Sequence, residues 1–467
     1  MSTATFDIRG FNLCESILRH TPDQLRSFIR RMKRLNMNTL IVHYDYGWRR
    51  YKKLIIEECK TAGVNIILMT FGPRTFWSYT DWDKDWFAQN ESGETFTRRL
   101  ECETQPCGFS HEGIEAFYYG ATQWLKSLEP EIKDVHMRAA DGIMFCRCGK
   151  CRGIPVQERW QPYVEAFTKA VLDTRPDLNF ETDIYVSRYE MPRNIETHRS
   201  MTRVMYDTFY RNNFFPIGSG KDVINADMMK YAAGHEHWDA PTPNSYHLKR
   251  LKEWSGIMPG RVYIHENVMA QGLLGTFQHC TGVYLDDLKT YRGLGIKGVC
   301  YEAYEPGYSF FERNFEILAH ALTDLDDARG NYKAPPLEQK LRTCDKMRLF
   351  CDDPSFPLQE HLIDPLLLKQ AQLFRECWRG ITADIYRRYL NFGLEHADIM
   401  DYLMIGFQAK AGLIFRKIKF KNLSEKAQDL LNRRKLWDFM EDIPMDQDPV
   451  AVTRKLMEEL YEKVENA

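Results

Sequence analysis

A strand-like segment followed by a helical segment recurs along the first 330 residues of this 467-residue chain. In the first unit, DIRGFNLC precedes Thr21-Pro22-Asp23-Gln24, which supplies an N-cap, a proline at the first helical position and a capping-box glutamine. Seven further strand-like segments begin near residues 38, 64, 134, 180, 202, 261 and 296. Because parallel strands need crossover helices, eight such units predict a (β/α)8 barrel over residues 1–330.

The alternative fold is a doubly wound open sheet. That fold usually carries a glycine-rich phosphate turn after its first strand, and RGFNLCES is not such a turn. From about Ala334 the pattern changes to helices only, and GNYKAPP at 330–336 is a plausible linker. We therefore expect a helical C-terminal domain over residues 331–467, which packs on the barrel or forms a homo-oligomer interface.

The composition excludes several classes of partner. A formal charge of −2 gives no support for binding to nucleic acid or to an anionic membrane. No apolar segment approaches the roughly 20 residues that span a bilayer. The N-terminus MSTATFDIRGFNL does not have the pattern of a secretory signal, so we expect a cytoplasmic protein whose twelve cysteines are thiols or metal ligands.

Reactive groups of such a barrel lie where its strands end. The predicted strand ends and the loops after them carry His43, Asp45, Trp48, Arg74, Trp77, Arg138, Asp141, Arg188, Glu190, Asp207, His265, Glu266, Tyr301 and Glu302. Carboxylates interleaved with aromatic rings suit sugar hydrolysis, in which one carboxyl group protonates the leaving oxygen and another group stabilises an oxocarbenium-like transition state. The sequence therefore favours a glycoside hydrolase acting on oligosaccharides, with no cofactor required for catalysis.

Three carboxylates are the candidate catalytic groups, and we expect them to meet at one pit: Asp141, Glu266 and Glu302. The candidate substrate-binding residues are His43, Asp45, Trp48, Arg74, Trp77, Arg138, His265 and Tyr301. The histidines can equally be core residues. Two other functions stay open, a carbohydrate-binding barrel without catalysis and a zinc-dependent enzyme.

Three cysteines follow the fourth predicted strand in the pattern C-x-C-x-x-C, namely Cys146, Cys148 and Cys151. Closely spaced thiolates are good ligands for zinc, and a structural site needs a fourth one. Cys107 is the nearest candidate because its loop neighbours theirs in a barrel, and Cys102 and His111 are substitutes. Iron–sulfur and redox functions fit the spacing less well. A structural zinc and unligated thiols remain the two interpretations, with an open zinc position as the catalytic variant.

Asp-Gly followed by C-x-C-x-x-C resembles the barrel of glycoside hydrolase family 163, the endo-β-N-acetylglucosaminidases and their relatives. The segment YLDDLKTYRGLGIKGVCYE is similar to that family's D-x-x-x-Y-x-x-x-G-x-x-G core, here Asp287, Tyr291, Gly295 and Gly298. The resemblance covers about residues 5–330. It implies a retaining hydrolase of a β-linked amino sugar, with Asp141 and Glu302 as matching positions. No adjacent Asp–Glu pair stands at a strand end, so Glu266 is an alternative nucleophile.

Overall fold

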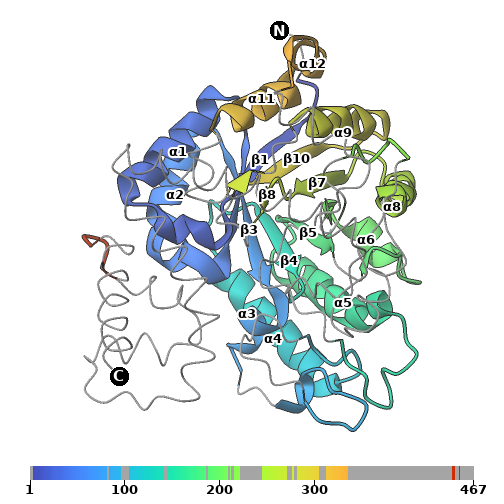
Figure 1. Cartoon of the computed structure of the whole chain (residues 1–467). Helices are drawn as coiled ribbons and strands as arrows, with labels where there is room; N and C mark the ends of the chain where they lie inside the picture. Colours follow the sequence, from blue (N-terminus) through green and yellow to red (C-terminus); the bar gives the residue numbers. More distant parts are fainter. Residues whose placement is uncertain are drawn as a thin grey trace, which may run out of the picture.

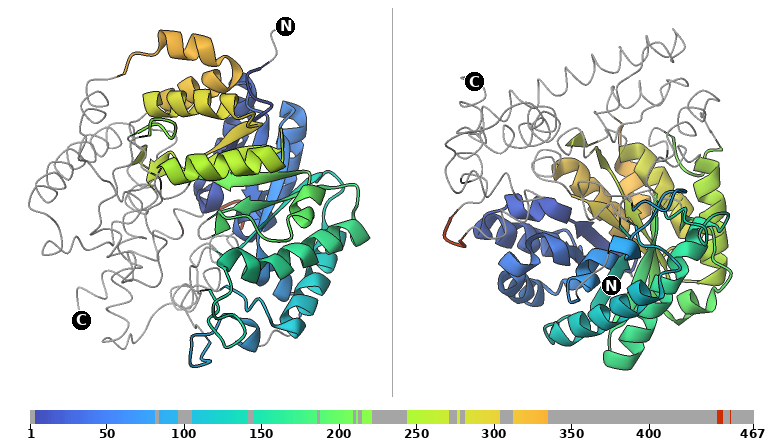
Figure 2. Two further views of the ribbon diagram at one scale, coloured as in Figure 1. Left: turned by 90° about the vertical axis from the view of Figure 1, so that its right-hand side faces the viewer. Right: turned by 90° about the horizontal axis from the view of Figure 1, so that it is seen from below.

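Eight parallel strands form a closed barrel in the computed structural model, surrounded by helices (Figures 1 and 2). The strands follow the order β1-β10-β7-β6-β5-β4-β3-β2 around the barrel. Their bounds are β1 Ile8–Asn12, β2 Thr39–His43, β3 Asn65–Phe71, β4 Asp134–Arg138, β5 Asn179–Ile184, β6 Arg203–Asp207, β7 Val262–Glu266 and β10 Gly298–Glu302. The predicted (β/α)8 barrel is confirmed.

The structure describes residues 4–80, 84–95, 105–140, 145–185, 188–208, 211, 215–220, 244–270, 276–277, 281–303, 312–334, 444–447 and 452. Most of the predicted C-terminal helical domain, residues 331–467, lies outside these ranges, so that domain stays a prediction. Arg50 of helix α2 (Arg49–Ala62) donates hydrogen bonds to the carbonyl oxygens of Pro444 and Gln447 at 3.2 and 3.0 Å. Among the described helices, none combines the length and the apolar character needed to cross a bilayer.

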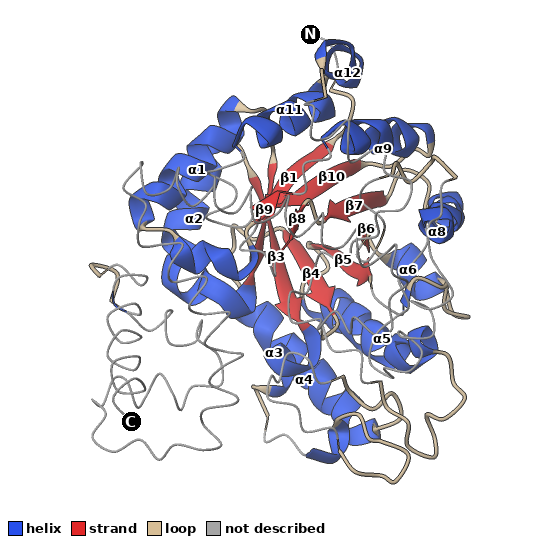
Figure 3. Ribbon diagram, viewed as in Figure 1, coloured by secondary structure: helices blue, strands red, loops and turns tan. Residues whose placement is uncertain are grey.

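Helices lie around the outside of the strands (Figure 3). They are α1 Pro22–Arg34, α2 Arg49–Ala62, α3 Gly72–Trp77, α4 His111–Ser127, α5 Val156–Thr174, α6 Glu196–Ser200, α8 Asn244–Ile257, α9 Thr281–Gly293, α11 Glu312–Thr323 and α12 Leu325–Asn331. The predicted capping box of α1 is present, because Thr21 and Gln24 exchange side-chain-to-backbone hydrogen bonds of 2.8 and 3.3 Å. A two-stranded sheet of β8 Met269–Ala270 and β9 Thr276–Phe277 was not predicted.

The strands are buried on both faces, as expected of a parallel barrel. Side chains on the inward face form a small apolar cluster, called here the inner cluster: Ile41, Ile67, Met69, Met205, Tyr263 and Cys300. Side chains on the outward face pack with the helices in the main core, among them Leu40, Val42, Leu68, Val204, Ile264 and Tyr301. Because successive residues of a strand alternate between faces, each strand-end residue points either into the barrel or toward the helices.

Two glycines allow the first and last strands to close the barrel. A Cβ on Gly298 of β10 would lie 1.9 Å from the carbonyl oxygen of Ile8, and one on Gly10 of β1 would lie 2.5 Å from the Cys300 Sγ. Both distances are far below van der Waals contact. Any larger residue at either position would therefore push β1 and β10 apart.

Candidate active site at the barrel mouth

Seven polar side chains point into the barrel at the carboxyl ends of the strands. We call them the inward ring: Asn12, His43, Arg138, Asp183, Asp207, His265 and Glu302. All seven are buried, with exposed fractions between 0% and 6%. Four of them lie two positions after a residue of the inner cluster, on the same face: His43, Asp207, His265 and Glu302. This end of the barrel is where enzymes of this fold carry out their chemistry.

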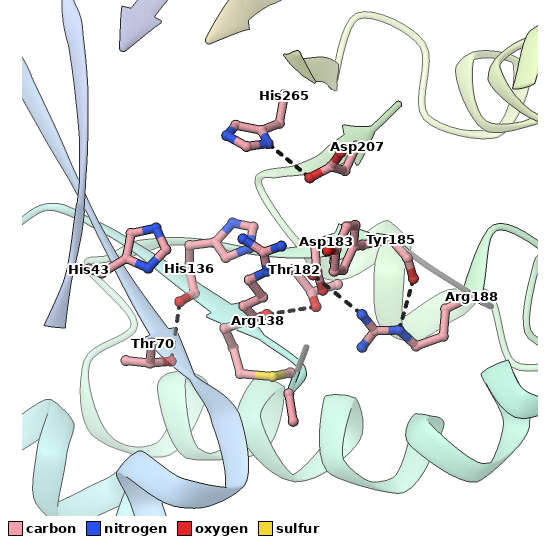
Figure 4. Close-up of polar contacts among 12 residues, drawn as sticks. His43, Thr70, His136, Arg138, Thr182, Asp183, Tyr185, Arg188, Asp207 and His265 are labelled. Carbon is pink, nitrogen blue, oxygen red and sulfur yellow. Dashed lines mark hydrogen bonds and ion pairs between the residues drawn. The ribbon is translucent and has the colours of Figure 1, made fainter. Parts of the chain in front are cut away.

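One chain of hydrogen bonds joins three strands of the ring. His265 Nδ1 lies 2.8 Å from Asp207 Oδ2 (Figure 4). His265 Nε2 lies 3.0 Å from Asn12 Nδ2. Asn267 donates to the other Asp207 oxygen at 3.0 Å. With an amide donor at Nε2, the imidazole carries its proton on Nδ1 and donates it to Asp207. The ring of His265 is therefore held in one orientation and one tautomer.

His43 faces the same interior from β2. Its ring stacks on Tyr46 at a centroid distance of 5.7 Å, and its Nε2 lies 3.4 Å from the Cys14 Sγ. Burial lowers the pKa of His43 well below its usual value, and the positive charge of Arg138 and the neighbouring His265 lower it further. His43 is thus neutral at physiological pH and offers a hydrogen bond rather than a charge.

Two arginines converge on Asp183 (Figure 4). Arg188 Nη2 lies 3.4 Å from Asp183 Oδ2, and Arg138 Nε lies 3.6 Å from the same oxygen. The Arg138 guanidinium also lies over the ring of Tyr185, 4.3 Å from its centroid. Two positively charged arginines face one buried carboxylate, so this side of the mouth has an excess of positive charge. It is therefore suited to a negatively polarised group of a ligand.

A second polar network fills the barrel below the ring. Glu181 of β5 accepts hydrogen bonds from His136 Nδ1 at 2.9 Å and from the Tyr263 hydroxyl at 2.5 Å, and it pairs with Arg203. Burial alone would raise the pKa of Glu181, but Arg203, His136 and Tyr263 together hold it below its usual value. Arg203 also pairs with Asp134 at 2.5 Å. Each carboxylate of this network has cationic partners, so the network supports the ring from below.

Glu266 does not face the mouth, so the expectation that it meets Glu302 at one pit is wrong. It is the residue after His265 and therefore points outward, between β7 and α9. Its Oε1 accepts hydrogen bonds from Thr208 at 2.8 Å and from Arg211 at 3.0 Å, and its Oε2 accepts one from Tyr291 at 2.8 Å. Three donors hold a carboxylate that is 1% exposed. We assign Glu266 to the scaffold and not to catalysis.

The same network explains the D-x-x-x-Y-x-x-x-G-x-x-G segment. Asp287, four residues before Tyr291 on α9, binds Arg211 at 2.6 Å and accepts the Ile217 backbone N–H at 2.6 Å. Burial raises the pKa of Asp287 to about 7, against the lowering effect of Arg211. Gly295 ends the turn after α9 with a φ of 68°, which favours glycine. Together with Gly298 at the barrel seam, the segment anchors α9 and closes the barrel.

Other predicted substrate-binding residues lie in the core. Trp48, Trp77 and Tyr301 are 1–2% exposed and pack in the main hydrophobic cluster. The Trp77 indole N–H donates to the Gly113 carbonyl oxygen at 2.8 Å. These three rings pack in the main core and not in the inward ring, so the structure gives no support to the expectation that they contact substrate.

Asp45 stabilises the start of α3. Its carboxylate accepts hydrogen bonds from the Phe71 backbone N–H at 3.0 Å and from the Thr75 hydroxyl at 2.8 Å. Arg74 lies in α3, but its side chain is outside the description. Asp141, the remaining candidate catalytic residue, also lies outside the described residues, directly after Ala140, where a described stretch ends. Neither expectation is tested.

The four predicted metal ligands do come together. The Sγ atoms of Cys107, Cys146, Cys148 and Cys151 all lie within 4.8 Å of one another. Cys107, not His111, is the fourth member of this set. No disulfide joins any of the seven cysteines in the part of the chain that the structure describes.

The strand-end list missed two members of the ring. Asn12 lies inside the predicted first strand DIRGFNLC, whereas it is the last residue of β1. Asp183 is not a predicted strand end because FETDIYVSRYE, residues 180–190, reads as one strand, whereas β5 ends at Ile184. The alternation FETDI contained the signal, since Glu181 and Asp183 are the only charged residues of a buried strand and share one face.

No family model matches the chain, and no curated protein matches it. Solved structures of similar fold include Gan42B, a GH42 β-galactosidase, with 10% identity and a TM-score of 0.46 over 77% of this chain and 63% of that one. The PgaB glycoside hydrolase domain from Bordetella bronchiseptica is 12% identical, with a TM-score of 0.44 over 68% and 99%. A D-psicose 3-epimerase from Clostridium cellulolyticum is 10% identical, with a TM-score of 0.35 over 69% and 98%. Likenesses this distant carry no information on the activity of this chain.

Proposed function

We propose that the chain is a glycoside hydrolase whose reaction takes place at the inward ring. The observation that carries the proposal is the set of buried carboxylates on the inward face at the carboxyl ends of β5, β6 and β10, namely Asp183, Asp207 and Glu302. Cleavage of a glycosidic bond needs a carboxyl group that protonates the leaving oxygen and a second group that stabilises positive charge at the anomeric carbon.

Glu302 is the best candidate for the acid/base. Its side chain lies on the inward face, two positions after Cys300 of the inner cluster, and is 1% exposed. Glu302 is the last residue of β10, and β10 lies opposite β4 in the closed barrel. We keep Asp141, which follows β4, as the partner carboxylate, on the basis of the family resemblance.

His43 and Arg138 would orient the sugar. A neutral imidazole can donate or accept a hydrogen bond to a sugar hydroxyl, and a guanidinium group donates to hydroxyl or acetamido oxygens. For the finer identity we propose a β-linked N-acetylhexosamine and retention of configuration, as the family resemblance implies. The charge of the chain gives no reason to add nucleic acid or membrane as partners.

The two alternative functions have less support from the described residues. A sugar-binding barrel would depend on exposed tryptophans, and Trp48 and Trp77 are buried in the core. A catalytic zinc keeps an open position for water, whereas the four clustered thiols form a complete set of protein ligands.

The test is hydrolysis of a panel of 4-nitrophenyl glycosides and of N-acetylhexosamine-containing oligosaccharides by the purified chain. We expect release from β-N-acetylhexosaminides, with the β-anomer of the product seen first by NMR. The Glu302→Gln variant, shown to be folded by circular dichroism, should lose this activity. Failure of the folded wild-type chain to cleave any glycoside of the panel would refute the proposal.

A further inference from the structure

The cysteine cluster lies where two loops of the barrel meet. Cys107 belongs to the loop before α4, and the other three cysteines belong to the loop between β4 and α5. The Sγ of Cys107 lies 3.9 Å from that of Cys148 and 3.8 Å from that of Cys151. A tetrahedral ion with zinc–sulfur bonds of about 2.3 Å holds its sulfurs about 3.8 Å apart. These two distances match that spacing, and all four sulfurs lie within 4.8 Å of one another.

Other states of four thiols fit this geometry less well. A disulfide needs sulfurs about 2.05 Å apart, and the Sγ of Cys107 lies almost twice that distance from those of Cys148 and Cys151. A four-iron cluster places iron and sulfide atoms between its thiolates and needs a wider cage. Thiols are weak hydrogen-bond donors, so four of them gather little stability without an ion.

The surroundings of the cluster match a metal centre. The Gln89 backbone N–H donates to the Cys146 Sγ at 3.3 Å, a contact that stabilises a thiolate ligand. Arg159 donates to the Cys146 carbonyl oxygen at 2.8 Å, which places a cation beside the sulfurs. Four thiolates around a divalent ion leave a net charge of −2, and Arg159 offsets part of it.

Contacts with α5 and a tight turn also fix the positions of the four cysteines in the two loops. The Tyr163 hydroxyl donates to the Cys107 carbonyl oxygen at 2.8 Å. A Cβ on Gly108 would lie 2.2 Å from the Arg159 carbonyl oxygen, so only glycine lets this loop lie against the helix. Backbone N–H groups of Cys151 and Arg152 both donate to the Cys148 carbonyl oxygen at 2.9 Å, which forms the tight turn of the C-x-x-C pair.

We propose that Cys107, Cys146, Cys148 and Cys151 bind one zinc ion in a closed tetrahedral site, and that this ion joins the loop before α4 to the loop after β4. The second loop begins at the mouth of the barrel, directly after Arg138. Gln105, two residues before Cys107, donates to the Ala140 carbonyl oxygen at 2.5 Å. The ion therefore holds the chain segment that leaves the ring, and it acts on the site through the loops rather than on substrate.

The first test is the metal content of the full chain, purified without a metal-binding tag. We expect one zinc per chain by inductively coupled plasma mass spectrometry. Replacement by cobalt should give the intense sulfur-to-cobalt absorption and visible bands of a tetrahedral thiolate site. Neither measurement needs a variant. Iron in place of zinc, a chain without metal, or the weak spectrum of octahedral cobalt would each overturn the proposal.

A pair of substitutions locates the site. Cys148→Ser changes the least buried of the four ligands and should lower zinc affinity at least tenfold in a chelator competition. Cys59→Ser, at a buried thiol of α2 outside the cluster, should keep one zinc per chain. After chelation, backbone hydrogen exchange should become faster at residues 105–110 and 145–154. The exchange rate at residues 281–293 should not change. Equal zinc affinity of both variants, or unchanged exchange in the two loops, would contradict the assignment.

Discussion

Glu266 and Glu302 are the last residues of adjacent strands, and each is 1% exposed. They nevertheless belong to different parts of the molecule. Glu302 follows Cys300 on the inward face, whereas Glu266 points between β7 and α9 into a network with Thr208, Arg211, Asp287 and Tyr291, called here the outer network. Burial and strand position are equal, and only the face differs.

The difference separates scaffold from chemistry. A carboxylate with three donors from the protein has its hydrogen-bonding capacity used by the fold, and moving a proton to it would break those bonds. An inward carboxylate at the carboxyl ends of the strands lies where enzymes of this fold carry out their chemistry. The comparison therefore predicts that substitutions in the ring change turnover, and that substitutions in the outer network change stability.

The largest expected effect is on catalysis by the ring. Glu302→Gln keeps the size of the side chain and removes its ability to transfer a proton, so we expect kcat to fall by about 10²- to 10⁴-fold. The melting temperature should stay within a few degrees of the wild-type value. Steady-state kinetics on the best substrate of the panel and differential scanning fluorimetry measure the two quantities. Normal turnover by this variant would remove Glu302 from the reaction.

Glu266→Gln should have the opposite profile. It leaves Arg211 with one carboxylate partner instead of two inside the protein, and breaking such a buried pair costs about 3–5 kcal/mol. We expect the free energy of unfolding in urea to fall by that amount, while kcat of the folded fraction changes less than twofold. A loss of kcat without a loss of stability would return Glu266 to the catalytic candidates.

The outer network should also give the stability a dependence on pH. The pKa of Asp287 is about 7 in the folded chain and about 3.9 in an unfolded one. Between these values the folded state keeps a proton that the unfolded state has lost, so stability falls as pH rises from about 4 to 7. Unfolding free energies at pH 5 and pH 7 should differ by about 2 kcal/mol more for the wild type than for Asp287→Asn. Equal pH dependence in both proteins would show that Asp287 is ionised throughout.

Tyr291→Phe should have the smallest effect. The substitution removes one donor to Glu266 Oε2 and leaves Arg211 and Thr208 in place. We expect a loss of about 1–2 kcal/mol of unfolding free energy and unchanged kcat. The same urea titration measures it, and a change in KM or kcat would mean that the outer network reaches the mouth.

Much of the fold could be predicted because local signals agree with it. The capping box at Thr21 and Gln24, the glycine after α2 at Gly63, and eight apolar strand segments each indicate an element that the structure contains. The meeting of Cys107 with the other three cysteines followed from the adjacency of βα loops in a barrel.

The face of each strand could not be predicted in the same way. Strands such as VYIHE and GVCYE are apolar on both faces because both faces are buried, so no alternation marks the inside. Glu266 and Glu302 therefore looked equivalent in sequence. Trp48, Trp77 and Tyr301 looked like ligand contacts for the same reason, since aromatic residues at strand ends serve either the core or the site.

The most direct test of the account is a crystal structure of the Glu302→Gln variant with a bound N-acetylhexosamine oligosaccharide. The account predicts that the glycosidic oxygen lies within hydrogen-bonding distance of the substituted side chain, with the sugar surrounded by inward-ring residues. An oligosaccharide bound against the outer network, or on any surface away from the carboxyl ends of the strands, would contradict it.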